Sequence, residues 1–299
     1  MKLEKLLSNY RKERRPRPKT IANRKEILYV FIRDTGVVDT DNVSFKVIAD
    51  WRDDVLKRAA PATWDSYWLG LRCLWNFGVE QGYFNHNPFT KIRREAAKRV
   101  SPTTVDRGVI TEAIEYLMDD EEPLKPGWFW ALVVRTFYYT GMHRGELVGL
   151  RWRDIRGTYD QCQVMATHGT NREPRQIVLE TEISTSLRDL RRITTNVLGR
   201  QPLPDDQVFN VTLFYVRYRG GELTNAHING MFRRLSDAMG VKLTPNILRD
   251  TMATLLLQNN QHIAPVARLL GHNDGRTTLK YLNPTVRHQR SVTGALPRL

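Results

Sequence analysis

Arginine, histidine and tyrosine side chains gather in three segments of the second half of this 299-residue chain. The segments read TGMHRGELVGLRW at 140–152, TPNILRDTMAT at 244–254 and LLGHNDGRTTLKYLNP at 269–284. Guanidinium groups hold phosphate oxygens through paired hydrogen bonds, so segments of this composition suit chemistry on a phosphate. The common short motifs are absent: the sequence has no P-loop, no GxGxxG, no HExxH and no CxxC. The seven histidines are scattered along the chain, and we therefore expect no metal site.

The charge of the chain points to a polyanionic partner. The sequence holds 46 Lys and Arg against 32 Asp and Glu, a net charge of +14. A charge of this size suits phosphate neutralisation, although charge alone also fits a basic protein with no nucleic-acid role. Residues 1–20 alone hold eight Lys and Arg against two Glu. The candidate DNA contacts are Arg14, Arg15, Arg17, Lys19, Lys98, Arg99, Arg172 and Arg175.

Length and composition predict a folded protein of about two domains, with 41% apolar residues. The two cysteines, Cys73 and Cys162, exclude a disulfide scaffold and predict buried thiols in a reducing cytosol. No apolar run nears the roughly 20 residues of a membrane span, and the charged N-terminus is no secretory signal. We therefore expect a cytoplasmic protein.

Apolar spacing predicts helices over most of the chain, at 18–35, 45–58 and 61–82 in the first half. A polar, basic stretch around 96–107 predicts a linker. In the second half the pattern predicts helices at 110–121, 125–141, 143–155, 186–199, 225–240, 246–260 and 262–272, with a β-hairpin from 161–168 and 175–180. The expected fold is mostly α: a helical domain at 1–95 and an α-rich domain with a small sheet at 108–299.

The three polar segments resemble the three boxes of the tyrosine recombinase (phage integrase) family. The family patterns are T-G-x-R-x-x-E-L-x-x-L-x-W, then H-x-L-R-H-T-x-A-T, then L-G-H followed by T-T and a tyrosine. His272 and Tyr281 keep the family's nine-residue spacing. The first half resembles the family's core-binding domain. The resemblance implies a two-domain clamp round duplex DNA, without metal or nucleotide cofactor.

The resemblance also implies roles for individual residues. Tyr281 corresponds to the nucleophile, which attacks a DNA phosphodiester and leaves a 3′-phosphotyrosyl bond. Arg249 corresponds to one of the family's two arginines, and His272 to a donor of a hydrogen bond to the phosphate. The phosphotyrosyl bond would store the energy for rejoining the strand.

Three positions depart from the family patterns. His143 stands where the first box has its arginine, and Arg144 follows one residue later, a rotation of ~100° on a helix. Asn246 replaces a proton-handling histidine and cannot transfer a proton. The hairpin lysine of the family is missing, which leaves His168, Arg172 and Arg175 as candidates. Of these, His168 could donate a proton near neutral pH.

Two functions therefore remain open at this stage. The first is a site-specific recombinase or integrase of a mobile genetic element, favoured by Tyr281, Arg249 and His272. The second is a relative with an impaired active site that binds DNA as a regulator or accessory factor, favoured by the three departures. Either would be nucleoid-associated. The resemblance also implies a homo-oligomer, dimer or tetramer, on double-stranded DNA. A partner recombinase could complete the site, and the segment 285–299 could dock on a neighbour.

Overall fold

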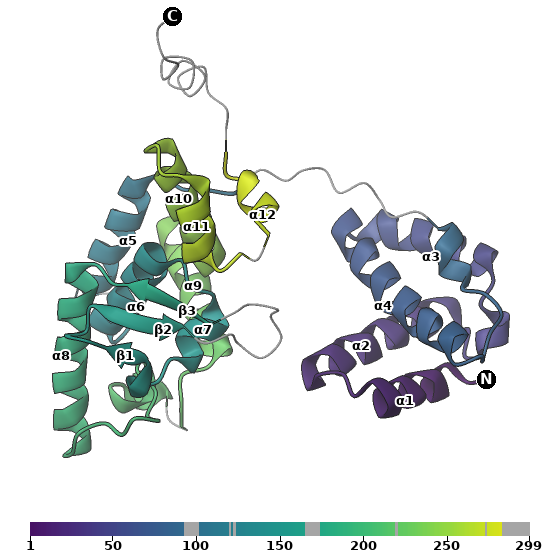
Figure 1. Ribbon diagram of the computed structural model, residues 1–299, viewed down its shortest axis with the longest axis horizontal. Helices are drawn as coiled ribbons and strands as arrows, with labels where there is room; N and C mark the ends of the chain where they lie inside the picture. The colour runs from purple at the N-terminus through teal and green to yellow at the C-terminus, as the bar shows by residue number, and fades with distance from the viewer. Residues whose placement is uncertain are drawn as a thin grey trace, which may run out of the picture. The chain divides into compact units, whose positions relative to one another are not determined.

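The computed structural model describes residues 1–92, 102–119, 121, 124–164, 174–218, 221–272 and 274–282. The chain forms two compact units, Met1–Val100 and Ser101–Leu299, each described here by itself (Figure 1). The prediction of a mostly helical chain with one small sheet is confirmed.

The N-terminal unit consists of helices and two short 3-10 turns. Its helices are α1 Leu3–Arg14, α2 Pro18–Thr35, α3 Phe45–Arg58 and α4 Pro61–Glu80. Proline occupies the first turn of α2 and of α4, where its missing N–H has no helical partner to lose. The Ser44 hydroxyl accepts a hydrogen bond from the Val47 N–H at 3.3 Å and so caps α3. The sequence predicted helices α2, α3 and α4.

Helix α1 was missed because its many charges obscure a narrow apolar stripe. Leu3, Leu6 and Tyr10 follow one another at helical spacing and are buried. They pack into a core rich in tryptophan, in which Trp64 and Trp75 are almost fully buried. The interpretation of the tryptophan-rich α4 as core, rather than as a platform for stacking bases, is confirmed.

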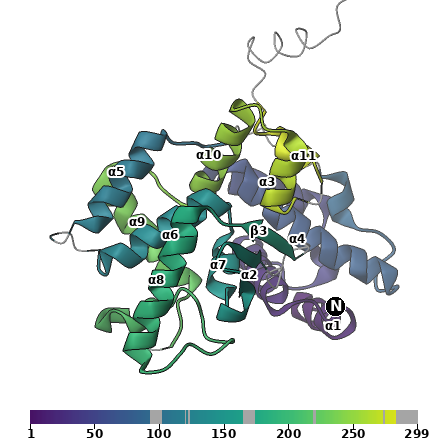
Figure 2. The ribbon, with the colours of Figure 1, turned by 60° about the vertical axis from the view of Figure 1, so that its left-hand side comes forward.

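The C-terminal unit places one apolar helix at its centre. The α-helices and strands of this unit are α5 Arg107–Met118, α6 Gly127–Thr140, α7 Arg144–Gly149, β1 Ile155–Arg156, β2 Gln161–Val164, β3 Arg175–Val178, α8 Thr181–Leu198, α9 Asn225–Met239, α10 Pro245–Gln258, α11 Ile263–Leu270 and α12 Arg276–Leu279. The central helix is α6. Helix α6 packs against α5, α8 and α10 (Figure 2). Its Phe129, Val133 and Phe137 are fully buried, as its nearly continuous apolar sequence predicted.

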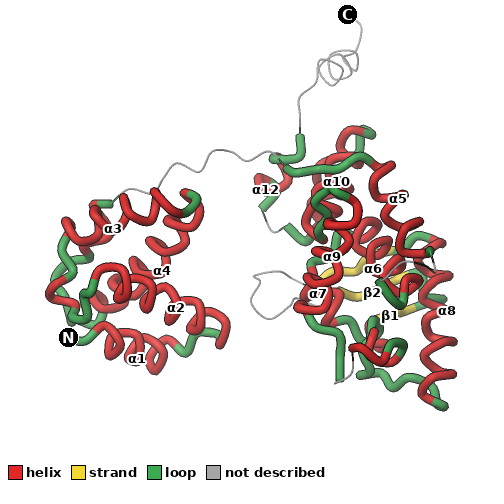
Figure 3. The backbone as a smooth tube through the Cα atoms, turned by 180° about the vertical axis from the view of Figure 1, so that it is seen from behind, coloured by secondary structure: helices red, strands yellow, loops and turns green. Residues whose placement is uncertain are grey.

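The three strands form an antiparallel sheet in the order β1-β2-β3, drawn in yellow in Figure 3. In the pairing of β2 with β3, Cys162 lies opposite Ile177, and both side chains are buried. The pairing of β2 with β3 confirms the predicted hairpin, whose turn at 165–173 lies outside the described residues. The two-residue strand β1 was too short to show a period in the sequence.

Both cysteines are free thiols, and Cys162 is buried as expected. Cys73 is only half-buried, which corrects the prediction for that residue; its sulfur accepts a hydrogen bond from Arg24 Nη2 at 3.2 Å. In the part of the chain described above, no helix is long and apolar enough to cross a membrane.

Candidate active site

Helix α10 and the turn that follows α11 bring the second and third polar segments together. The Thr244 hydroxyl accepts a hydrogen bond from the Ile247 N–H at 3.1 Å, which fixes the start of α10 one turn before Arg249. Gly271 ends α11 with φ at +65°, a conformation that favours glycine. The chain then turns to present His272 and, after α12, Tyr281.

Arg249 is the buried centre of this cluster, with only 3% of its surface exposed. Its Nη2 donates to the Leu270 carbonyl at 2.6 Å, and its Nη1 donates to the Gly141 carbonyl. Gly141 has φ at +59°, and a Cβ atom there would collide with the Met252 side chain. The two carbonyls, one from the end of α6 and one from the end of α11, therefore hold the guanidinium in a fixed orientation.

His272 lies against Arg249 and Thr278. Its Nε2 is 3.1 Å from Arg249 Nη2, and its Nδ1 is 2.8 Å from the Thr278 hydroxyl oxygen. Because a guanidinium can only donate, Nε2 accepts, and we therefore assign the proton of the neutral ring to Nδ1, which donates to Thr278. The Thr278 side chain is fully buried, so this contact sets the plane of the imidazole.

The Tyr281 side chain is 2% exposed and lies parallel to the His272 ring, with ring centroids 6.5 Å apart. Its hydroxyl donates a hydrogen bond of 2.6 Å to Asp250 Oδ1. Burial raises the pKa of Tyr281 well above the usual value for tyrosine, and the Asp250 carboxylate raises it further, while Arg249 opposes both. At neutral pH the hydroxyl is therefore protonated and must lose its proton to act as a nucleophile.

The structure thus brings three predicted residues together, Arg249, His272 and Tyr281, and adds a fourth, Asp250, that sequence reasoning missed. The signal was present in the second segment. Where the family pattern H-x-L-R-H ends in histidine, this chain has Asp250, a residue that can accept a proton or a hydrogen bond. Spacing alone could not show that this carboxylate reaches the hydroxyl of a residue 31 positions away.

The first polar segment takes a different arrangement. Arg144 Nη1 donates to Asn229 Oδ1 on α9, so this guanidinium is directed to α9 rather than to Arg249. The backbone N–H of His143 donates to Glu146 Oε2 at 2.8 Å and starts α7. The His143 ring nitrogen Nε2 is buried and has no hydrogen-bond partner among the described residues. Asn246 is exposed in the first turn of α10.

Arg175 was expected to be a surface contact for DNA, and the structure places it differently. Its guanidinium forms two hydrogen bonds with the Glu146 carboxylate, at 2.7 and 2.9 Å, and its Nε donates to the Leu269 carbonyl at 2.9 Å. The side chain of Glu146 is fully buried and that of Arg175 is 9% exposed. The physical reason is that a buried carboxylate needs a cation, and Arg175 supplies it. The pair joins α7, β3 and the end of α11 directly behind His272.

The other predicted contacts with DNA lie in several places. Residues Arg14, Arg15, Arg17 and Lys19 are exposed around the junction of α1 and α2. Of these, Arg14 forms an ion pair with Glu80 on α4. Four predicted residues lie outside the described part of the chain: Lys98, Arg99, His168 and Arg172. The segment 285–299, expected to dock on a neighbour, also lies outside it.

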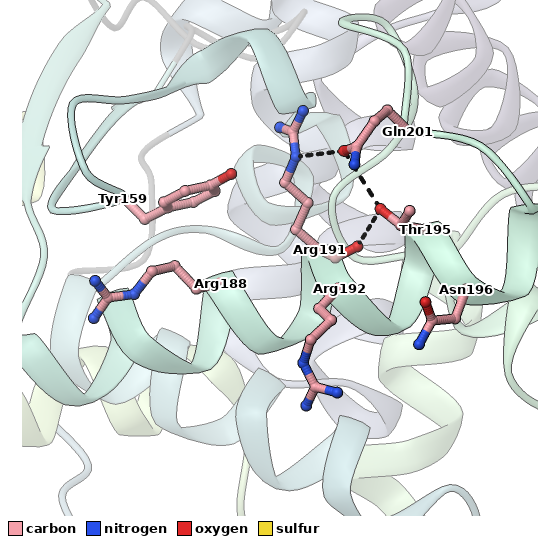
Figure 4. Close-up of a pocket in the computed structure, with 7 residues that line it drawn as sticks. All are labelled: Tyr159, Arg188, Arg191, Arg192, Thr195, Asn196 and Gln201. Atoms are coloured by element: carbon pink, nitrogen blue, oxygen red, sulfur yellow. Dashed lines mark hydrogen bonds between the residues drawn. The ribbon is translucent and has the colours of Figure 1, made fainter.

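Among the hollows on the described part of the C-terminal unit, two bear on the site. One borders the cluster and is formed by Pro174, by Arg175–Val178 of β3, by Pro265, Arg268 and Leu269 of α11, and by Gly271 and His272. The other lies on α8 and contains Arg188, Arg191 and Arg192, whose side chains point in different directions (Figure 4). Arg191 Nε donates to the Gln201 side chain at 3.3 Å, and Arg192 pairs with Asp189 at 3.4 Å. Because the three guanidinium groups diverge, they form a solvated surface rather than a site for one anion.

Over the residues that the structure describes, no group of three His, Cys, Asp or Glu side chains could hold a metal ion. The cluster itself offers a tyrosine hydroxyl beside a carboxylate, with a guanidinium and an imidazole alongside.

Comparison with known proteins places this site in a family. Residues 91–288 match the model of the phage integrase family. The chain is 28% identical over 287 residues to a protein of Pseudomonas aeruginosa named as tyrosine recombinase XerC, covering 91% of this chain and 65% of that relative. It is 25% identical over 277 residues to tyrosine recombinase XerC of Oceanobacillus iheyensis, covering 90% of this chain and 86% of that relative. The chain spans less than two thirds of the length of the Pseudomonas aeruginosa relative.

Solved structures share the fold. The Tn1549 transposon integrase, in complex with transposon right end DNA, superposes with a TM-score of 0.76 at 18% identity, covering 99% of each chain. A lambda integrase dimer bound to a COC′ core site gives a TM-score of 0.72 at 18% identity, covering 96% of this chain and 97% of that one. The match of the family model covers more than half of the chain, and the chain therefore belongs to the phage integrase family, the tyrosine recombinases.

Proposed function

We propose that this chain cuts and rejoins duplex DNA at specific sites through a 3′-phosphotyrosyl intermediate at Tyr281. The observation that carries the proposal is the contact network of Arg249, His272 and Tyr281, drawn from two of the three family boxes. A nucleophile, a fixed guanidinium and an oriented imidazole are the groups that transfer of a phosphoryl ester requires.

In the proposed reaction, the Tyr281 oxygen attacks the phosphorus and the bond to the 5′ oxygen breaks. Negative charge gathers on the non-bridging oxygens, where Arg249 donates a hydrogen bond. For His272 to donate a second one, its Nε2 must release Arg249 and carry a proton when DNA binds. The 5′ oxygen leaves with the bonding electron pair and takes up a proton, for which His168 is the predicted donor. A 5′ hydroxyl later attacks the phosphotyrosyl bond, which reseals the strand and releases Tyr281.

We further propose that residues 1–95 form a core-binding domain and residues 108–299 the catalytic domain of a clamp on DNA. The exposed cations at the junction of α1 and α2, Arg15, Arg17 and Lys19, would contact phosphates there. Structural relatives are DNA complexes, and one is a dimer on its core site, which supports binding of this chain as a dimer or tetramer.

A second candidate function is DNA binding without cleavage, as a regulator or an accessory factor. The observation that favours it is the placement of Arg144 on Asn229, together with His143 at the position of the family's first arginine. A missing transition-state donor costs on the order of 10²–10³ in rate. Binding depends on many phosphate contacts and would persist.

One experiment separates the two functions. A random duplex library is first selected for binding to the purified chain, and the selected site is then given a nick next to the phosphate to be cleaved. The short leaving strand diffuses away and traps any covalent intermediate. A recombinase forms a protein–DNA adduct that resists denaturant, whereas a binding protein shifts the DNA without forming one.

Salt dependence tests the binding part of the proposal. Because phosphate contacts release counterions, we expect affinity for duplex DNA to fall log-linearly with salt, by roughly 10³ or more between 50 and 200 mM if six or more phosphates are contacted. Electrophoretic mobility shift or fluorescence anisotropy measures it. An affinity that stays constant over this range would contradict a clamp on the phosphate backbone.

A further inference from the structure

We propose that Asp250 is the group that accepts the proton of Tyr281 during strand cleavage, an inference that rests on the function proposed above. The pattern of the family's second box has histidine at this position, not a carboxylate. Asp250 would therefore be a catalytic residue outside that pattern, next to Arg249 on α10.

The geometry meets the first requirement for a general base. The Tyr281 hydroxyl donates to Asp250 Oδ1 at 2.6 Å, within the range for direct proton transfer between heavy atoms. The hydroxyl is held there because the Tyr281 ring is buried and belongs to a small apolar cluster that includes Leu257 and Leu270. The proton of the nucleophile thus already points at a carboxylate oxygen before DNA arrives.

The neighbouring groups are less suited to this task. Arg249 has no lone pair to offer, since a guanidinium stays protonated. Both ring nitrogens of His272 are engaged, Nε2 by Arg249 and Nδ1 by Thr278. Asn246, at the position of the family's proton-handling histidine, is an amide and accepts no proton.

Two cations also lie near the Asp250 carboxylate and the Tyr281 hydroxyl. The Lys280 ammonium lies 3.6 Å from Asp250 Oδ1 and 4.5 Å from the centre of the Tyr281 ring. The Arg249 guanidinium lowers the pKa of Tyr281 and so stabilises the developing phenolate. The proton of the hydroxyl therefore lies between a carboxylate that can accept it and cations that favour its loss.

The step balances as follows. The O–H bond of Tyr281 breaks and its proton passes to Asp250 Oδ1, while the tyrosine oxygen forms a bond to phosphorus. The phosphorus bond to the 5′ oxygen breaks, and that oxygen takes a proton from the predicted donor, His168. On rejoining, the attacking 5′ hydroxyl returns its proton to that donor, and the proton on Asp250 returns to Tyr281 as the tyrosine oxygen leaves.

The test compares Asp250→Asn with the wild type on the selected, nicked DNA site, in single-turnover cleavage at neutral pH. Asparagine keeps the shape and can accept the hydrogen bond but not the proton, so the rate should fall roughly 100-fold. Asp250→Glu should recover part of that loss. Asp189→Asn, the same change on the exposed face of α8, is the matched control and should leave the rate unchanged.

A substrate with sulfur in place of the bridging 5′ oxygen distinguishes the residue that accepts the proton of Tyr281 from the residue that protonates the leaving group. A thiolate leaves without a proton, so this substrate should rescue a His168→Ala variant but not Asp250→Asn. On this sulfur substrate, which needs no proton donor, the wild-type rate should be nearly flat between about pH 6.5 and 8.5, whereas that of Asp250→Asn should rise about tenfold per pH unit because solvent must ionise the tyrosine. A purely structural role of Asp250 would not produce this change of slope.

A second measurement does not depend on cleavage. With the tyrosine Cζ carbons labelled with ¹³C, and the Tyr281 signal assigned by its loss in Tyr281→Phe, Asp250→Asn should lower the pKa of Tyr281. If that pKa is unchanged, or if Asp250→Asn cleaves within threefold of the wild type or faster, Asp250 is not the acceptor although the recombinase function stands. If the wild type binds the site and forms no adduct, the proposed function fails, and the role of Asp250 fails with it.

Discussion

The segment around Arg249 and the segment around Arg144 each carry an arginine of a family box, but the two side chains are placed differently. Arg249 is buried and held by two backbone carbonyls and by His272. Arg144 extends from the first turn of α7 to an asparagine on α9. The buried residue of the first segment is Glu146, which pairs with Arg175 of β3 and so ties α7 to the sheet.

The difference shows what each segment preserves. The proposed nucleophile Tyr281, its proposed proton acceptor Asp250 and the guanidinium of Arg249 belong to one connected group. At the position of the family's first arginine stands His143, whose Nε2 is buried and has no hydrogen-bond partner within the described residues. We infer that this chain retains the machinery for covalent attachment and has changed the machinery that stabilises charge on the phosphate.

The largest effect is expected from Arg175→Met, which removes the cation of a buried pair and leaves the fully buried Glu146 carboxylate uncompensated. The free energy of unfolding should fall by about 3–5 kcal/mol, measured by urea denaturation. The double variant Glu146→Gln with Arg175→Met should regain part of the loss. A change below about 1 kcal/mol in the single variant would show that this pair is not the scaffold described here.

The two arginines should differ sharply in cleavage. Arg249→Ala removes the fixed guanidinium and should lower single-turnover adduct formation by roughly 10²–10³. Arg144→Ala should change the rate by less than threefold, because its side chain is bound to Asn229. Equal losses in both variants would mean that Arg144 moves onto the phosphate when DNA binds, and the comparison drawn above would be wrong.

A gain is expected at the altered position. His143→Arg restores the residue of the family pattern and should speed adduct formation by about 10- to 100-fold, less than the full value of a positioned donor because the site has adapted to histidine. In the same assay, His168→Lys tests a further departure from the family patterns, the missing hairpin lysine. If His143→Arg lowers the rate, the histidine itself serves the phosphate.

The smallest effect is expected from a substitution in the N-terminal unit, outside the segments around Arg249 and Arg144. Ser44→Ala removes the cap of α3 in the N-terminal unit and should cost about 1 kcal/mol of stability. Adduct formation on DNA already bound should stay unchanged. A slower chemical step in this variant would connect the N-terminal unit to the reaction in a way that the present account does not include.

Much of the fold followed from the sequence because its helices carry clear apolar periods and clear end signals. Pro18, Ser44 and Pro61 marked helix starts, and the continuous apolar run at 125–141 marked the central helix. Helix α1 escaped because eight cations in twenty residues suggested a basic tail, although three leucines and a tyrosine give it an apolar face.

The site was predictable only in part. Arg249, His272 and Tyr281 were found through the spacing of the family boxes, and the structure brings them into contact. Asp250 and the true partner of Arg175 were missed because both contacts join residues far apart in sequence. From the sequence alone, Arg175 near the hairpin was interpreted as a surface cation. Only the structure shows that the buried carboxylate of Glu146 is its partner.

The central claim is that Tyr281, within the network of Arg249 and His272, attacks DNA. The most direct measurement is to digest the protein–DNA adduct formed on a nicked, selected site and to identify the modified peptide by mass spectrometry. The account predicts a nucleotide 3′-phosphate on Tyr281 in the wild type, and no adduct with Tyr281→Phe, which still binds the site. A wild type that binds without forming an adduct, or an adduct that persists in Tyr281→Phe, would contradict it.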